Sequence, residues 1–300
     1  MVLAETDNDD SITPTAKIKP KFLLCLFLDG FGVAANTEAN AVAAAKMPNF
    51  FRFVREYPVT LLSGKTRDPR RRYWSLGCGQ EDDSENYLKA ESCLSEILSN
   101  NGRRQLKISA SEQFVNLSYH FNNGKEKAFA GEEWLSLSSP SKEDTLKSFI
   151  KELAGTVTQA IHEQKTDIIF CSLPLAHEAT VRGDFKEIVK SLQQIDKTLA
   201  KIISSVLNID GLVIITAPFG NAEKTRDLAA DWEDREPTSN PVPFLLIGNE
   251  YEGKTIGLVD PLDGDLSVLA PAGTLADFAP TVLSLQHITQ PGDMSGNSLI

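Results

Sequence analysis

The chain of 300 residues carries 41 acidic side chains against 30 lysines and arginines, which gives a formal net charge of −11. Nucleic acids and anionic membranes are polyanions, so this balance argues against either as a partner. The hydrophobic fraction of 41% is ordinary for a globular chain and is sufficient for a sizeable core.

The cysteines and the N-terminal segment indicate a reduced, cytoplasmic setting. The four cysteines form neither a CxxC pair nor a zinc-binding spacing. Residues 1–17 are polar and acidic and lack a basic start followed by an apolar stretch, so they predict a disordered tail and not a signal peptide. No apolar run is long enough to span a bilayer. We therefore expect a cytoplasmic protein.

The first predicted strand is the continuous apolar run Phe22–Leu28, which ends at Asp29-Gly30. This pattern is typical of a buried parallel strand, and ligand sites in open α/β sheets lie at the carboxyl ends of such strands. A helix is predicted from Pro48 to Arg55. Further strands are predicted at Val59–Leu62, Leu106–Ile108, Phe114–Phe121, Asp167–Leu173, Leu212–Thr216 and Val242–Ile247, and further helices at Ala90–Leu98, Asp144–His162, Asp184–Leu207 and Leu275–Leu285. Strands alternating with helices of this length predict an α/β fold, a mainly parallel sheet with helices on both faces.

The only dense basic cluster extends from Lys65 to Arg72. A short basic run of this kind is typical of a solvated loop. Because guanidinium groups bind phosphate well, a local anion site is the other interpretation. Both interpretations remain open from the sequence.

Four stretches of the chain carry motifs in a fixed order. They are Leu26–Gly32, Phe114–Gly124 with Gly131-Glu132, Ile214–Glu223 with Asn240–Pro243, and Leu275–Val282 with Met294–Leu299. Together, over most of residues 22–300, they resemble the cofactor-independent (2,3-bisphosphoglycerate-independent) phosphoglycerate mutases of the alkaline phosphatase superfamily. The resemblance implies a metalloenzyme core that holds two divalent ions, usually manganese, and a serine that carries the phosphoryl group. It also implies an inserted second domain whose arginines bind the substrate.

Most metal-ligand positions of that family are altered in this chain. Asp29 matches the first ligand, but the family's Asp-His pair falls at Pro218 and Phe219, whose side chains have no donor atom. A second pair of family ligands is an aspartate followed four residues later by a histidine. In this chain His177 takes the place of that aspartate, and Val181 takes the place of that histidine. Pro237 occupies the position of a further ligand histidine of the family, and Gln113 occupies the position of its active-site lysine.

The segment that bears the nucleophile in the family is missing, and so is the inserted domain. The chain runs from Leu61-Leu62-Ser63 through the basic cluster to Leu76–Gly79, and residues 81–89 form a short polar connector where the insert would lie. We therefore predict a single phosphatase-like domain over residues 18–300 with no catalytic residue of the family type. The hydroxyls that could substitute, none with an activating histidine nearby, belong to Ser63, Thr66 and Ser75.

Three hypotheses follow for function. The first is a non-catalytic relative, a pseudoenzyme that binds a protein partner or a phosphorylated metabolite, with Arg70 and Arg71 as candidate ligand-binding residues. The second is a metal-dependent phosphohydrolase or phosphotransferase of reduced type that uses Asp29. The third is a regulatory or structural subunit of an active mutase. We expect no cofactor, or at most one divalent ion at Asp29.

The resemblance also yields expectations about geometry. The strands that end at Asp29, Leu173 and Thr216 should lie side by side, because the family's ligands come from these three ends. Phe219 and Val181 should pack in an apolar pocket near Asp29. The alternative to metal binding at Asp29 is that its carboxylate caps nearby backbone amides.

Overall fold

The structure is a computed structural model that describes residues 21–81, 84–138, 143–227 and 232–300. The predicted disordered tail, residues 1–17, lies outside the described residues, and so do positions 82 and 83 of the connector.

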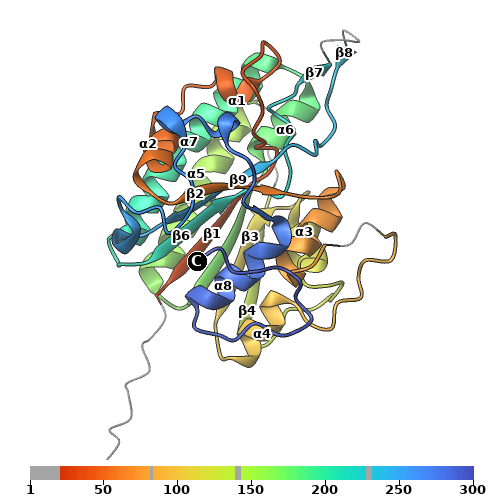
Figure 1. The fold of residues 1–300 in the computed structure, drawn as a ribbon, viewed down its shortest axis with the longest axis vertical. Helices are drawn as coiled ribbons and strands as arrows, with labels where there is room; N and C mark the ends of the chain where they lie inside the picture. The colour runs from red at the N-terminus through yellow and green to blue at the C-terminus, as the bar shows by residue number, and fades with distance from the viewer. Residues whose placement is uncertain (1–20, 82–83, 139–142, 228–231) are drawn as a thin grey trace, which may run out of the picture.

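An eight-stranded sheet forms the centre of the fold (Figure 1). Its order is β10-β2-β9-β6-β1-β5-β3-β4, in which β9 runs antiparallel to both neighbours and the other pairings are parallel. The prediction of an α/β fold with a mainly parallel sheet is confirmed. The strands are β1 (Leu23–Leu28), β2 (Val59–Ser63), β3 (Gln105–Ala110), β4 (Glu132–Leu137), β5 (Ile168–Leu173), β6 (Leu212–Thr216), β9 (Val242–Ile247) and β10 (Gly273–Thr274), with a separate hairpin of β7 (Arg226–Asp227) and β8 (Trp232–Glu233).

Helices cover both faces of the sheet (Figure 1). On one face α7 packs against α1, α2, α5 and α6, and on the other α3 and α4 pack against α8. None of the described helices is both long and apolar enough to cross a membrane. The helices are α1 (Ala41–Ala44), α2 (Pro48–Glu56), α3 (Pro69–Cys78), α4 (Leu94–Asn100), α5 (Glu143–Glu163), α6 (Leu175–Arg182), α7 (Phe185–Leu207) and α8 (Phe278–Leu285), with the π-helical turn η1 (Asn116–His120) and the 3₁₀ turns η2 (Asn249–Tyr251), η3 (Leu262–Gly264), η4 (Leu266–Val268) and η5 (Leu275–Asp277).

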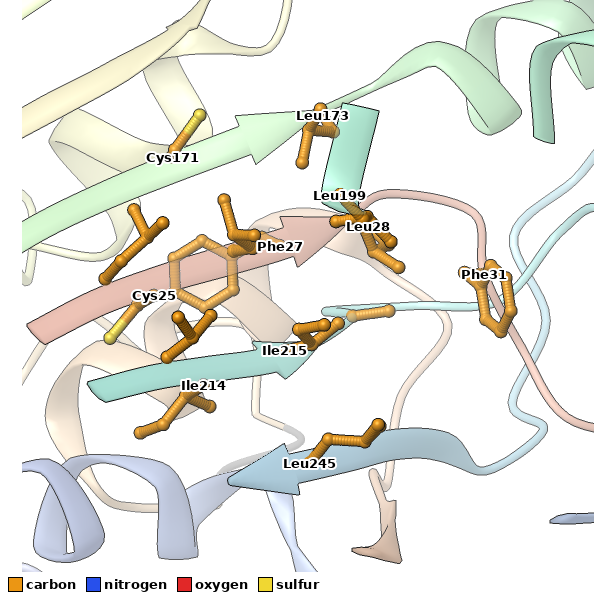
Figure 2. Packing of buried hydrophobic residues seen from close by; sticks show 14 of the residues in the cluster. Cys25, Phe27, Leu28, Phe31, Cys171, Leu173, Leu199, Ile214, Ile215 and Leu245 are labelled. Carbon is orange, nitrogen blue, oxygen red and sulfur yellow. The ribbon is translucent and has the colours of Figure 1, made fainter. Parts of the chain in front are cut away.

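Strand β1 lies at the centre of the core, because all six of its residues are buried. The ring of Phe27 lies 5.4 Å from that of Phe278 in α8 and 5.8 Å from that of Tyr73 in α3. Figure 2 shows Cys25 and Phe27 among apolar side chains of β5 and β6. Truncating a buried phenylalanine of this kind to alanine costs about 3–5 kcal/mol. Packing therefore fixes the position of β1 and of Asp29 at its carboxyl end.

The predicted strand at Phe114–Phe121 is wrong, because the segment forms the π-helical turn η1. Its apolar residues alternate as in a strand, but Leu117 and Phe121, four residues apart, are both buried. The hydroxyl of Ser118 donates to the carbonyl of Phe114 at 2.7 Å, again four residues apart. Tertiary packing of the helical face therefore outweighs the strand-like alternation.

Helix α3 is a second difference, because Arg70–Arg72 of the basic cluster are helical, whereas Lys65 and Arg67 lie in the exposed loop before the helix. Asp68 caps the helix by accepting from the N–H of Arg70 at 3.0 Å, and Pro69 occupies the first turn. Gly79 ends the helix with a φ of 63°, a left-handed conformation that glycine adopts without strain. These start and stop signals are present in the sequence and predict the helix better than the charge pattern predicts a loop.

Strand β4 has no counterpart among the predicted strands, because its Glu132-Glu133 start is polar and weakens the strand pattern. It nevertheless pairs with β3 along its length, from Gln105 opposite Glu132 to Ala110 opposite Leu137. Both strands follow the connector at 81–89 and extend the sheet that contains β1. The bounds of a single domain over residues 18–300 stay a prediction.

Candidate metal centre

The carboxyl ends of β5, β1 and β6 meet at one edge of the sheet. Leu28 lies opposite Leu173 in β5, and Phe27 opposite Thr216 in β6, all in parallel register. The N–H of Gly30 donates to the carbonyl of Phe219 at 3.1 Å, so the segments after β1 and β6 stay in contact beyond the strands. The predicted adjacency of the three strand ends is confirmed.

Asp29 is fully buried, and both of its carboxylate oxygens have protein partners. The hydroxyl of Tyr73 donates to Oδ1 at 2.7 Å, and the hydroxyl of Ser172 donates to Oδ2 at 2.9 Å. These partners are side chains of α3 and β5, not the backbone amides that the capping interpretation expects. Burial raises the pKa of Asp29 to about 7, although the two hydroxyl hydrogen bonds act in the opposite direction.

Arg72 brings a buried cation to the same edge of the sheet. Its side chain is 1% exposed, and it donates to the backbone carbonyls of Pro218 at 3.0 Å, Thr66 at 2.5 Å and Gly64 at 3.4 Å. Burial lowers the pKa of Arg72 to about 10, which still leaves it charged at neutral pH. The guanidinium therefore lies against the backbone of Pro218, the position at which the family carries a metal ligand.

Arg70 and Arg71, the candidate ligand-binding residues, lie in α3 next to Arg72 but contact Asp68 and not the buried edge of the sheet. Arg70 forms a bidentate contact with Asp68, with hydrogen bonds of 3.0 and 2.9 Å. Arg71 lies 3.7 Å from the same carboxylate, and its guanidinium is 5.7 Å from the ring centroid of Tyr87. The basic cluster is therefore divided: Arg72 enters the core, whereas Arg70 stays at the surface with its side chain 63% exposed.

The residues that replace the remaining ligands do not form one apolar pocket. Phe219 is fully buried, and its ring meets the ring of His177 edge-on at 5.0 Å. His177 is near Asn221, with Nδ1 3.4 Å from Oδ1, and burial lowers the pKa of His177, which favours the neutral ring. Val181 is 47% exposed on α6, so the prediction that it packs beside Phe219 is wrong. Its helical position turns it to solvent.

Glu223, the last residue of the Gly220–Glu223 turn, joins three loops near this edge. It is 2% exposed and accepts from the N–H groups of Gly32 at 3.1 Å and Asn221 at 2.7 Å. It also accepts from the side chains of Asn240 at 2.9 Å and Thr238. A carboxylate with this many donors has a structural role, which agrees with the interpretation of the segment as a structural turn.

The residues at this edge do not fit a two-metal site. Asp29 is the one ligand carboxylate that the family resemblance assigns to this edge, and both of its oxygens accept hydrogen bonds from hydroxyl groups. Pro218 and Phe219 offer no side-chain donor, and divalent ions of this kind need several carboxylate or imidazole ligands. Within the part of the chain that the structure describes, no three His, Cys, Asp or Glu residues are grouped so as to hold an ion.

The possible substitute nucleophiles have backbone partners or are enclosed. The hydroxyl of Ser63 donates to the carbonyl of Gly273 at 3.3 Å, and the hydroxyl of Thr66 accepts from the N–H of Asp68 at 3.1 Å. Ser75 is 6% exposed within α3. None of these contacts is with a general base that could activate the oxygen.

The raised pKa of Asp29 predicts a pH-dependent stability. A carboxyl group with a pKa near 7 in the folded state and 3.8 in the unfolded state keeps its proton longer when folded. Its contribution to the free energy of unfolding is therefore complete below about pH 4 and is lost as the pH rises through 7, with an upper bound of about 4 kcal/mol. Glu178, whose pKa burial also raises to about 7, adds to the same slope.

We expect the variant Asp29→Asn to lose its share of that slope, because an amide cannot ionise. Denaturant unfolding at pH 5 and pH 8 measures the difference, and Glu178→Gln serves as the matched control for the second carboxyl group. If the wild type and Asp29→Asn lose equal stability between the two pH values, the pKa of Asp29 is not raised in the folded protein.

Residues 21–290 match the family model described as the metalloenzyme superfamily, and the chain belongs to that superfamily. It is similar to the 2,3-bisphosphoglycerate-independent phosphoglycerate mutases of Shewanella amazonensis and Shewanella oneidensis. Each is 31% identical over 212 residues, which cover 69% of this chain and 38% of the mutase. The chain thus spans well under half the length of the curated relatives it matches. The resemblance predicted from the four stretches is confirmed.

Solved structures agree with this assignment at the level of the fold. A phosphoglycerate mutase from Leishmania mexicana, studied at low cobalt concentration, superposes with a TM-score of 0.77 at 11% identity, over 95% of this chain and 98% of that chain. The alkaline phosphatase of the Antarctic bacterium TAB5 superposes with a TM-score of 0.60 at 10% identity, over 91% and 99% of the two chains. At such identities the likeness concerns the fold alone.

Proposed function

We propose that this chain is a non-catalytic relative of the cofactor-independent phosphoglycerate mutases, which acts by binding and not by phosphoryl transfer. The observation that carries the proposal is the environment of Asp29, whose two oxygens accept hydrogen bonds from Tyr73 and Ser172 in a fully buried position. Two-metal catalysis requires ligands that can reach the ions and a solvent-accessible place for the transferred group. Neither requirement is met around Asp29.

Helix α3 supports the proposal because it supplies the groups that close this edge. Tyr73 engages Asp29, and the neighbouring Arg72 engages the carbonyl of Pro218. A buried guanidinium repels a divalent cation, and the repulsion is strong where water is excluded. Arg72 is therefore a buried cation at this edge, and the carboxylates whose charges act on it belong to Glu223 and Glu81.

The competing hypothesis of a reduced phosphohydrolase is tested with a generic phosphate ester. We expect no hydrolysis above background with Mn²⁺, with Mg²⁺ or with a chelator. Hydrolysis that requires a divalent ion and is lost in Asp29→Ala would replace the proposal with that hypothesis. The hypothesis of a regulatory subunit makes a different prediction, namely co-purification with an active mutase.

A second candidate function, binding of a phosphorylated metabolite, rests on the position of Arg70 and Arg71. Both lie in the first turn of α3, where backbone N–H groups and the helix dipole favour anions. Asp68 already engages both side chains, so a ligand would have to displace its carboxylate.

The test of this second candidate is a thermal shift with 3-phosphoglycerate. If the site binds the ligand, Arg70→Ala or Arg71→Ala should reduce the shift, since a bound ligand stabilises the folded state. Arg104→Ala is the matched control, because Arg104 also pairs with a surface aspartate, Asp167, at 2.9 Å. A shift that is equal in all four proteins would exclude binding at α3.

A further inference from the structure

Strand β4 is the last strand on one side of the sheet, next to β3 (Figure 1). Among the described residues no strand pairs with its outer edge. The side chain of Leu135 on this strand is 37% exposed, and Val115, in the helical turn that leads into η1, is 51% exposed. An open edge strand with exposed apolar residues and no lysine or proline is a template for pairing with another strand.

The direction of the free backbone groups follows from the pairing with β3. The carbonyl of Gly131 accepts from the N–H of Gln105, and the carbonyl of Leu137 accepts from the N–H of Ser111. Peptide groups alternate in direction along a strand, so residues 131, 133, 135 and 137 face β3. Trp134 and Ser136 therefore present their N–H and C=O groups to the outer side.

We propose that β4 pairs antiparallel with β4 of a second copy of this chain, about a two-fold axis through Leu135. In an antiparallel ladder two facing residues must both point toward the partner or both point away from it. With Leu135 opposite its own copy, Trp134 of each chain faces Ser136 of the other. Both free N–H groups of the edge then donate across the seam.

An alternative register with Trp134 opposite its own copy fits less well. It requires the N–H of Glu132 to donate across the seam, but that group already donates to the carbonyl of Phe129 at 3.0 Å. Neither register places two acidic residues opposite each other, since Glu133 meets Leu137 in the register through Leu135 and Leu135 in the alternative. The hydroxyl of Ser136 also comes opposite Trp134, whose buried indole N–H has no hydrogen-bond partner.

A groove of about 410 Å³ lies beside β4. By the same alternation, Leu135 and Glu133 point to the face covered by α5, where the groove lies. Apolar and polar residues of β3, β4 and α5 line it, among them Leu106, Ala160 and Glu163. Two acidic residues in the groove and a net charge of −11 on each chain oppose association, so added salt should strengthen the dimer.

Light scattering coupled to size-exclusion chromatography is the first test. The wild type should form a dimer whose population rises with concentration and salt. Ser136→Pro removes one outward N–H without disturbing a hydrogen bond to β3, and Leu135→Lys places two like charges on the axis, so both should be monomeric with unchanged circular dichroism. Val259→Lys, at a position that is 75% exposed elsewhere on the surface, should remain dimeric.

Leu135→Cys tests the register directly. Facing residues whose peptide groups point away from the partner have Cα atoms about 4.5 Å apart, which is within the range of a disulfide. Mild oxidation should link two copies through residue 135, whereas Val259→Cys should stay unlinked, and the four native cysteines are buried. A wild type that is monomeric at all concentrations overturns the proposal. So does a dimer that Ser136→Pro leaves intact and Leu135→Cys fails to link.

Discussion

The purified chain is expected to show no conversion of 3-phosphoglycerate to 2-phosphoglycerate above background, even in excess Mn²⁺. The reaction needs a nucleophile that takes up the phosphoryl group and a second domain that holds the glycerate for its return. From the sequence we expect this chain to lack both parts. Metals and a nucleophile account for many orders of magnitude in rate, so a chain without them should show no measurable turnover.

The assay requires an active cofactor-independent mutase as a positive control and metal-free and Asp29→Ala samples as negative controls. The Asp29→Ala variant should be indistinguishable from the wild type, since neither turns over substrate. Turnover that depends on Mn²⁺ and disappears in Asp29→Ala would refute the non-catalytic assignment. Turnover that persists in Asp29→Ala would instead indicate a contaminating mutase.

The second large effect is expected at a buried ion pair between β3 and β4. Lys107 and Glu132 have no exposed side-chain surface, and Nζ lies 2.9 Å from Oε1. Asn122 accepts from the ammonium group and donates to both carboxylate oxygens at 3.1 Å, and Nζ lies 4.5 Å from the ring centroid of Phe121. Lys107→Met should lower the free energy of unfolding by about 3–5 kcal/mol, because it leaves the Glu132 carboxylate buried without its cation.

Denaturant unfolding measures this effect. Lys21→Met is the matched control, since Lys21 pairs with Asp210 and Glu250 at the surface, at 3.0 and 3.3 Å, and such pairs contribute at most about 1 kcal/mol. Lys107→Met combined with Glu132→Leu should cost less than the sum of the two single changes, because the double variant leaves no unpaired charge. A cost below about 1 kcal/mol for Lys107→Met would show that the pair is not important for stability.

The strands and helices with strong periodicity could be predicted from the sequence. The apolar run of β1 and the apolar face of α7 are both buried in the core, so the local sequence pattern and the tertiary structure agree. The prediction failed at η1, where a helical face resembles strand alternation. It also missed α3, because its three consecutive arginines were interpreted as part of a basic cluster and not as a capped helix. β4 was missed because one of its acidic residues, Glu132, is compensated by Lys107, a partner 25 positions away in the chain.

At the candidate site, the sequence predicts only which ligand positions carry residues that cannot bind a metal. Pro218 and Phe219 can be recognised as non-ligands from their chemistry alone. What replaces the lost ligands could not be predicted, because Tyr73 and Ser172 reach Asp29 from segments 44 and 143 residues away. No local pattern indicates that Arg72 turns inward while Arg70 stays outside, since only the position of α3 against the sheet separates them.

We propose that hydroxyl groups and a buried arginine exclude a metal ion from the edge of the sheet where Asp29 lies, and Mn²⁺ binding tests this proposal most directly. The chain is dialysed against Mn²⁺, freed of unbound ion, and analysed for metal content beside Asp29→Asn. We predict far less than one ion per chain in the wild type and the same content in the variant, because hydroxyl groups occupy both oxygens of Asp29 and Arg72 places a cation at the same edge. One or more tightly bound ions per chain that disappear in Asp29→Asn would contradict the account.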